Sequence, residues 1–251
     1  MRALVRRHFA AVPFENISKL LLRDREGDGR PISMAEYLDG IEYSDFGGTC
    51  YVLNPFLAEL LRDLGYDAVL LGADMSTPDV HTCLRVTIDG LAYHVDVGFA
   101  APLREPIRLD SLPVQVNEGT NRYVLDRERD KVRLSMFAGE KPDVGYLAHD
   151  PPRSREHFDR IVTDSFRVSS TFMRWLRVSR VFDTYSLDLT NRILHRHENG
   201  QTVVTELQTM AELKVAVAGQ LSMQRCDVER AVAVLERHTG QPFFGQFSAG
   251  R

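Results

Sequence analysis

Residues 81–97 read HTCLRVTIDGLAYHVDV, two runs of alternating side chains that meet at Asp89-Gly90. An Asp-Gly pair between two such runs predicts a β-hairpin with a two-residue turn. In that register Cys83 faces Asp96, and successive side chains point to opposite faces of the hairpin. The hairpin therefore predicts a sheet with one apolar face and one polar face in this part of the chain.

The polar face of the predicted hairpin carries a possible catalytic pair. The side chains on this face are those of His81, Cys83, Arg85, His94 and Asp96. His81 lies diagonally across from Asp96, a separation of about 7 to 8 Å that an imidazole and a carboxylate can bridge. His94, two residues before Asp96 on the same face, is a competing partner. Two further interpretations stay open, namely a solvated polar face and a zinc site made by His81, Cys83, His94 and Asp96.

A candidate nucleophile follows two glycines in the run Phe46-Gly47-Gly48-Thr49-Cys50. Glycines let the backbone turn tightly and approach a ligand closely. We expect Cys50 at the edge of a helix, where free N–H groups stabilise a thiolate or an oxyanion. The alternative is that Cys50 is a small buried hydrophobic residue. A thiol nucleophile needs a base and a group that orients the base, and a cysteine, a histidine and an aspartate occur in that chain order here.

The composition is that of a globular protein with 251 residues, 43% of them hydrophobic and 26% charged. A net charge of -4 argues against generic nucleic-acid binding. The longest unbroken apolar run, residues 231–235, is far shorter than the roughly 20 residues of a membrane span. Three cysteines match no disulfide framework, and the first residues show no export signal. We therefore expect a cytoplasmic protein that binds neither nucleic acid nor membranes.

The hydrophobic periodicity changes along the chain. Apolar spacings of three and four residues predict helices at 2–11, 33–40, up to 65, 210–223 and 227–238. Asn54 and Pro55 resemble an N-cap and a first-turn proline, so we expect the third helix to start or to kink there. Alternating patterns predict strands at 68–72, 82–88, 91–97, 123–126, 131–136, 184–189, 192–197 and 202–207.

The strands between residues 68 and 136 indicate a small antiparallel barrel or sandwich. Three prolines make residues 141–154 the expected linker to the rest of the chain. Beyond it we expect a helical region and then a meander whose Asn199-Gly200 pair is typical of a type I′ hairpin turn.

Four short blocks share a pattern with known enzymes: Val12-Pro-Phe-Glu-Asn16, Gly47-Gly-Thr-Cys50 followed by Asn54, His81, and Asp96-Val-Gly-Phe99. This set of blocks resembles the arylamine N-acetyltransferase family, including its branch of macrolactam-forming amide synthases. They occur in the order of the family and at similar spacing. The resemblance extends from about residue 4 to at least residue 213.

The resemblance implies an α+β fold with an N-terminal helical bundle, a central antiparallel β-barrel and a C-terminal α/β lid. The corresponding domains are residues 1–67, 68–150 and 151–251, and a Cys-His-Asp triad lies between the first two. It also implies that Cys50 is the nucleophile, His81 the base and Asp96 the orienting carboxylate. Further positions that match the substrate pocket of the family are Phe14, Gly98 and Phe99.

The implied reaction is a ping-pong acyl transfer from a thioester donor to a small-molecule amine, which forms an amide without a metal. The expected donor is acetyl-CoA or another acyl thioester, on coenzyme A or on an acyl carrier protein. A rival function is that of an amide synthase that closes or releases a polyketide bound to a carrier protein. A thioester hydrolase and a binding module without activity also stay open.

Two residues beside the nucleophile depart from the family pattern. The family usually has an arginine before the glycine pair and an acid two residues after the cysteine, where this chain has Phe46 and Val52. We expect a less polar channel that admits a larger acyl chain, and a Glu15 carboxylate that pairs with Arg23 or Arg25. Seven arginines could form a solvated helix face, or a surface for coenzyme A phosphates or an acidic carrier; they lie at 153, 155, 160, 167, 174, 177 and 180.

Overall fold

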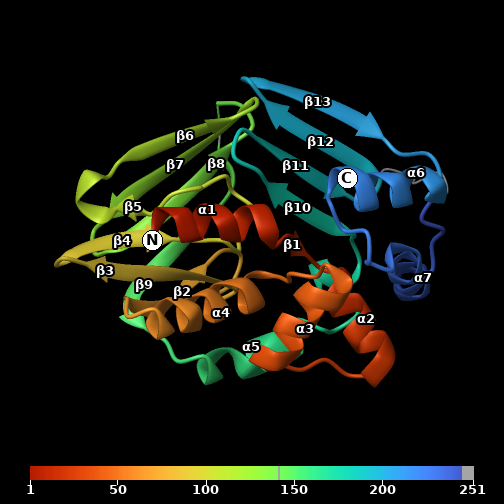
Figure 1. Ribbon diagram of the computed structural model, residues 1–251, viewed down its shortest axis with the longest axis horizontal. Helices are drawn as coiled ribbons and strands as arrows, with labels where there is room; N and C mark the ends of the chain where they lie inside the picture. The colour runs from red at the N-terminus through yellow and green to blue at the C-terminus, as the bar shows by residue number, and fades with distance from the viewer. Residues whose placement is uncertain (141, 245–251) are drawn as a thin grey trace.

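The computed structural model describes residues 1–140 and 142–244. Figure 1 shows an α+β arrangement in which two sheets stand side by side, with one group of helices below them and another beyond the second sheet. Helix α1 crosses in front of the space between the two sheets. This is the α+β class predicted from the sequence, with N-terminal helices, an antiparallel barrel and a C-terminal sheet with helices.

Four helices form the N-terminal part. They are α1 (Arg2–Ala11), α2 (Ile17–Glu26), α3 (Met34–Ser44) and α4 (Cys50–Asp63). The first was predicted with these bounds, and the second was missed. Helix α3 is longer than predicted and begins with a capping box between Ser33 and Glu36. Gly27 follows the last residue of α2 and caps the helix, and its φ of 81° is a conformation that glycine adopts without strain.

Helix α4 begins at Cys50 rather than at Asn54, with Thr49 as its N-cap, and it contains Pro55. The expected start at Asn54 is therefore wrong. The Asn54 side chain is buried and bonds to the barrel, so it does not cap the helix. Proline removes one helical hydrogen bond. The helix continues because its apolar face packs against the barrel, and that face consists of Leu53, Phe56, Leu57 and Leu61.

Eight antiparallel strands form a nearly closed barrel with the order β5-β4-β3-β2-β9-β8-β7-β6. The strands are β2 (Asp67–Asp74), β3 (His81–Ile88), β4 (Leu91–Val95), β5 (Ile107–Arg108), β6 (Val114–Glu118), β7 (Asn121–Glu128), β8 (Lys131–Phe137) and β9 (Pro142–Pro152). The predicted hairpin register is confirmed, because Ile88 pairs with Leu91 and Val86 with Tyr93.

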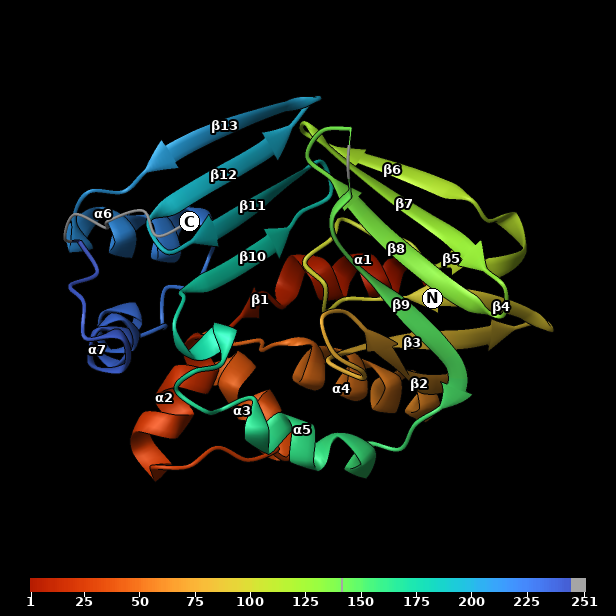
Figure 2. The same cartoon turned by 180° about the vertical axis from the view of Figure 1, so that it is seen from behind.

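The predicted linker at 141–154 is wrong, because Pro142–Pro152 is strand β9, between β2 and β8. Figure 2 shows this long green strand crossing the back of the barrel. Its prolines lie at or near its two ends, where a missing N–H disrupts the ladder least. Lys141, where the linker was expected to start, lies outside the described residues. The domain limits at 67/68 and 150/151 stay a prediction.

The second sheet has the strand order β1-β10-β11-β12-β13. Its strands are β1 (Phe14–Glu15), β10 (Arg177–Val181), β11 (Tyr185–Thr190), β12 (Ile193–Glu198) and β13 (Gln201–Glu206). The predicted meander is confirmed, and both residues of the Asn199-Gly200 turn have positive φ. Strand β1 brings a segment of the N-terminal part into this sheet, where it pairs with β10. Neither β1 nor β10 was predicted.

Shorter elements complete the chain. They are the helices α5 (Asp159–Asp164), α6 (Met210–Val215) and α7 (Val228–Thr239), a π-helical turn at Ala216–Gln220, and 3₁₀ turns at Leu109–Ser111, Glu156–Phe158 and Thr171–Met173. The helix predicted at 210–223 thus ends at Val215 and continues as the π turn. Among the described residues, no helix has the length and hydropathy needed to cross a membrane.

Three apolar cores hold these parts together. One lies between α4 and the outer face of the barrel, one fills the barrel, and one lies under the second sheet against α2, α6 and α7. The first two cores meet at β3, the strand that carries His81 on one side and Leu84 on the other.

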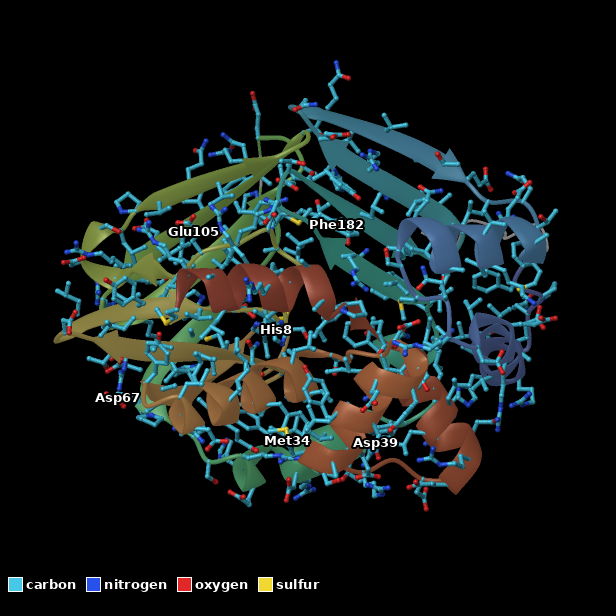
Figure 3. All side chains as sticks on the ribbon, in the orientation of Figure 1. His8, Met34, Asp39, Asp67, Glu105 and Phe182 are labelled. Atoms are coloured by element: carbon cyan, nitrogen blue, oxygen red, sulfur yellow. The ribbon has the colours of Figure 1, made fainter. Side chains whose placement is uncertain are left out.

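At the surface, two arginines of α1, Arg2 and Arg6, pair with Glu105, which Figure 3 labels near that helix.

Candidate active site

Cys50 is the first residue of α4, and its side chain is buried. The preceding loop is held against strand β1, because the Glu15 N–H donates to the Gly48 carbonyl (3.1 Å) and the Gly47 N–H donates to the Glu15 carboxylate (3.1 Å). A Cβ at position 47 would lie 1.9 Å from the Pro13 carbonyl oxygen, so only glycine fits. The loop thus places the thiol at a helix N-terminus, whose partial positive charge favours a thiolate.

His81 and Asp96 form a buried pair, with His81 Nε2 at 2.8 Å from Asp96 Oδ2. The hairpin brings these side chains together across the diagonal that the sequence predicted. Each residue is only 2% exposed, so the interpretation as a solvated hairpin face is wrong for this end of the hairpin. The polar face instead points into the barrel, whose interior core contains Cys83.

The electrostatics of this pair favour an imidazolium and a carboxylate. Burial alone would lower the pKa of His81, but the charge of Asp96, the hydrogen bond to it, and a hydrogen bond to Cys50 together raise the pKa of His81 above its ordinary value. Burial likewise opposes ionisation of Asp96, and the charge and hydrogen bond of His81 lower the pKa of Asp96 despite it. The Asp96 carboxylate and the His81 ring therefore favour each other's charged form.

His94 has a different partner from His81. Its Nε2 lies 2.7 Å from the hydroxyl oxygen of Tyr146, and burial lowers the pKa of His94 to about 4, so the ring is neutral. The Tyr146 ring also packs against the His81 ring, with the ring centroids 4.6 Å apart and the planes tilted by 31°. Burial, and then the charge of Asp96, raise the pKa of the tyrosine hydroxyl above its ordinary value. The structure therefore pairs Asp96 with His81 and leaves His94 behind Tyr146.

The sequence predicted that Asn54 caps a helix, but its side chain instead bonds to Asp96. Its Nδ2 donates to Asp96 Oδ1 (2.9 Å) and to the Thr82 carbonyl (2.5 Å), and its Oδ1 accepts from the Val97 N–H (3.0 Å). The Gly98 N–H also donates to Asp96 Oδ1 (2.8 Å). Asn54 therefore connects helix α4 to the segment that carries Asp96.

We expect Asn54→Leu to lower the free energy of unfolding by about 3 kcal/mol, because it leaves a buried carboxylate and a buried N–H short of partners. Chemical denaturation measures this change. The matched control is Asn117→Leu, on an exposed position of β6, for which we expect a change within about 0.5 kcal/mol. Equal stability of the two variants would contradict the role of Asn54.

Cys50 faces a cavity of about 220 Å³ between the helices, the barrel and the second sheet. Its lining includes Cys50, His81, Phe14, Gly98 and Phe99. A Cβ at position 98 would lie 2.6 Å from the Cys50 Cα, so glycine is needed where the two backbones approach. Most of the remaining walls are apolar, and the second sheet adds the ion pair of Arg177 with Asp188 (3.0 Å). The roles of Phe14, Gly98 and Phe99 in binding a substrate stay a prediction.

The expectations for Phe46 and Val52 are corrected by the structure. Neither side chain lines the cavity of Cys50, because both face a separate cavity on the other side of the loop. The Glu15 carboxylate accepts hydrogen bonds from Ser18 and Gly47. Arg23 donates to the Phe166 carbonyl, and Arg25 pairs with Glu26. The expected ion pair of Glu15 is therefore wrong.

The seven arginines between 153 and 180 do not form one helix face. Arg180 is buried and donates to backbone carbonyls, and Arg177 lies in the wall of the active-site cavity. Both belong to strand β10. Arg160 and Arg167 both lie near Asp164. The arginines are therefore distributed over several elements and do not share one helix face.

Comparison with known proteins agrees with this architecture. A family model described as N-acetyltransferase matches residues 1–224. An arylamine N-acetyltransferase of Mycolicibacterium smegmatis is 28% identical over 251 residues, covering 91% of this chain and 86% of that protein. The proansamycin X synthase of Amycolatopsis mediterranei is 27% identical over 241 residues, covering 87% of this chain and 88% of that protein.

A solved structure of Mycobacterium marinum arylamine N-acetyltransferase in complex with CoA superimposes with a TM-score of 0.79 at 25% identity, covering 94% of this chain and 91% of that chain. The three-part α+β fold is thus the fold of the arylamine N-acetyltransferases. The chain belongs to this family and is an arylamine N-acetyltransferase-like enzyme that transfers acyl groups to amines.

Proposed function

We propose that Cys50 takes an acyl group from a thioester and passes it to an amine, with His81 as the base and Asp96 as the group that orients it. The observation that carries this proposal is the buried pair of His81 and Asp96, 2.8 Å apart, beside a cysteine that opens a helix and faces a cavity. A thiol, a base and an orienting carboxylate are the parts that nucleophilic acyl transfer requires.

The first half of the reaction acylates the enzyme. The Cys50 sulfur attacks the carbonyl carbon of the donor thioester after its proton has passed to His81. The carbon to sulfur bond of the donor then breaks, and the departing thiolate takes the proton from His81. The products are an acylated Cys50 and a free thiol.

The second half uses the amine. Its nitrogen attacks the acyl carbon on Cys50 while His81 accepts a proton from it, and the bond to the Cys50 sulfur breaks. The amide leaves, and the imidazolium and thiolate are restored. Asp96 holds the ring of His81 and stabilises its cation in both halves.

We propose acetyl-CoA as the donor and a compact aromatic amine as the acceptor. A structure of an M. marinum relative contains CoA, which supports the donor. A dry cavity of about 150 Å³ holds benzene, so a cavity of about 220 Å³ suits an aromatic ring with a small acyl group. The rings of Phe14 and Phe99 line it. These features favour a small acyl group over the longer chain expected from Phe46 and Val52.

The second candidate function is amide synthesis on a polyketide bound to a carrier protein. It rests on the similarity to proansamycin X synthase over most of both chains. A carrier donor adds a protein interface whose charges steer association. Because the arginines of 153–180 lie on several elements and do not share one helix face, we favour coenzyme A.

We expect acetyl-CoA to give a kcat/KM at least equal to that of an acetylated carrier protein, and the two donors to respond alike to added salt. The experiment compares both donors at two salt concentrations, with and without an arylamine. A large preference for the carrier that weakens as salt screens the interface would favour amide synthesis. Donor consumption that is unaffected by the amine, without an amide product, would indicate a thioester hydrolase.

A further inference from the structure

A second and larger cavity lies on the opposite side of the nucleophile loop. Its volume is about 360 Å³, and it is enclosed by α2, α3, the first turns of α4, and α5. Gly48, Thr49, Tyr51 and Val52 face it, whereas the Cys50 between them faces the active-site cavity. The loop and the start of α4 therefore form a wall common to the two cavities.

The second cavity has apolar walls. They include the side chains of Leu22, Ile32, Phe46, Val52, Phe158 and Phe166. A dry cavity of about 150 Å³ is enough for benzene, so this one has room for an aromatic ring with a short chain or for an aliphatic body of similar size. Its walls thus suit a small apolar molecule.

One charged group lies deep in these walls. Lys19 on α2 is 8% exposed, its ammonium lies 3.8 Å from the centroid of the Phe166 ring, and it bonds to the Ser165 hydroxyl. Within residues 1–140 and 142–244 it forms no ion pair with a carboxylate. A buried charge without a counter-ion is costly, so this ammonium is a strong site for an anion.

The remaining charged groups that line the cavity lie nearer its mouth. Arg30 pairs with Glu26 and Glu36, Arg25 pairs with Glu26, and Arg155 pairs with Glu59. The two further carboxylates of the lining, Asp39 and Asp159, are exposed. Figure 3 labels Asp39 on α3, at the bottom of the molecule. Lys19 is therefore the buried charged group of this cavity with which an anionic ligand can pair.

We infer that this cavity is a second binding site, which takes a small monocarboxylate with an aromatic or short aliphatic body. The carboxylate pairs with the Lys19 ammonium, and the apolar body fills the space between Phe46, Ile32 and Phe158. A charge-assisted hydrogen bond beside apolar walls gives the carboxylate its advantage over a neutral analogue. The site lies outside the active-site cavity, with Cys50 close enough to act on the charge of Lys19, and binding there does not depend on the proposed acyl transfer.

The pH dependence of binding follows from the same contacts. Burial lowers the pKa of Lys19 to about 7, against an opposing effect of Cys50. The charged groups around the cavity that also act on a ligand are Arg25, Arg30, Glu36, Asp39, Arg155 and Asp159. Because a carboxylate binds the protonated amine, we expect affinity to be greatest below pH 7 and to fall as the pH rises above it.

The experiment titrates the Cys50→Ala protein with 3-phenylpropionate and with its neutral analogue 3-phenylpropionamide by calorimetry, at pH 6.5 and pH 9. We expect saturable binding of the acid at pH 6.5, about tenfold tighter than the amide, and weaker binding at pH 9. Equal affinity for acid and amide, or no saturable binding of the acid, would overturn the inference.

Three variants in the same background locate the ligand. Lys19→Met removes the charge at similar length, and Ile32→Trp fills the cavity from a loop without touching Lys19; we expect each to weaken binding of the acid by about tenfold or more. Lys214→Met makes the same change at an exposed lysine outside the cavity, which pairs with Glu229; it is the matched control and keeps the affinity. Unchanged binding in Lys19→Met and Ile32→Trp would place the ligand elsewhere. If Lys19→Met does not fold, Ile32→Trp and the comparison of acid with amide decide.

Discussion

Cys50→Ala lowers the rate of acyl transfer by about 10⁴-fold or more, because among the described residues that line the cavity Cys50 is the only thiol. The variant still folds, since it removes one small side chain at the start of α4 and leaves the loop contacts of Glu15 intact. Steady-state kinetics with acetyl-CoA and an arylamine measure the loss, and thermal unfolding checks the fold.

The two remaining cysteines provide the controls. Cys83 is fully buried in the barrel core, where burial raises the pKa of its thiol, and Cys226 has a raised pKa for the same main reason. Neither residue is in a position to replace Cys50. We expect Cys226→Ala to keep nearly full activity and Cys83→Ala to keep activity with some loss of stability. Activity that survives in Cys50→Ala and disappears in Cys226→Ala would mean that the nucleophile is assigned incorrectly.

His81→Gln has the second largest expected effect, a loss of about 10³-fold or more in kcat/KM, because it removes the base and the cation that faces the thiolate. In the native protein the charge of Asp96 overcomes burial and raises the pKa of His81, so the imidazolium persists well above pH 6.5. The pair contributes stability that is complete below the unfolded pKa of histidine and is lost as the pH rises through the higher folded pKa.

Alkylation by iodoacetamide measures this effect without any substrate. We expect the native Cys50 to react rapidly at pH 6.5. In His81→Gln the rate should be much lower at that pH and should rise with pH toward the ionisation of an ordinary thiol, near about 8.5. His94→Gln distinguishes the two histidines, since His94 bonds to Tyr146. If His94→Gln slowed alkylation more than His81→Gln, the assignment of the base would be wrong.

The barrel strands and the pair of His81 with Asp96 were predictable because short stretches of sequence determine them. The Asp89-Gly90 turn sets the hairpin register, and that register alone places His81 diagonally across from Asp96. Apolar periodicity likewise predicted the face of α4 that packs on the barrel. In these segments the contacts that matter lie within one hairpin or one helix.

The errors arose where distant contacts override local preference. Asn54 resembles an N-cap beside a proline, but its side chain bonds to Asp96, 42 positions along the chain. Prolines suggested a linker at 141–154, yet β9 is stabilised on both sides by β2 and β8. Phe46 and Val52 differ from the family pattern, and we predicted that they line the active-site channel. Their side chains instead face the second cavity. No local pattern contains this information.

The most direct test of the account is the mass of the protein after it is mixed with acetyl-CoA in the absence of an amine. The account predicts one added acetyl group, located on the peptide that contains Cys50, and its complete transfer to an arylamine that is added afterwards. An acetyl group on Cys83, Cys226 or a lysine, or a Cys50 adduct that the amine cannot discharge, would contradict the central claim that Cys50 carries the acyl group between donor and acceptor.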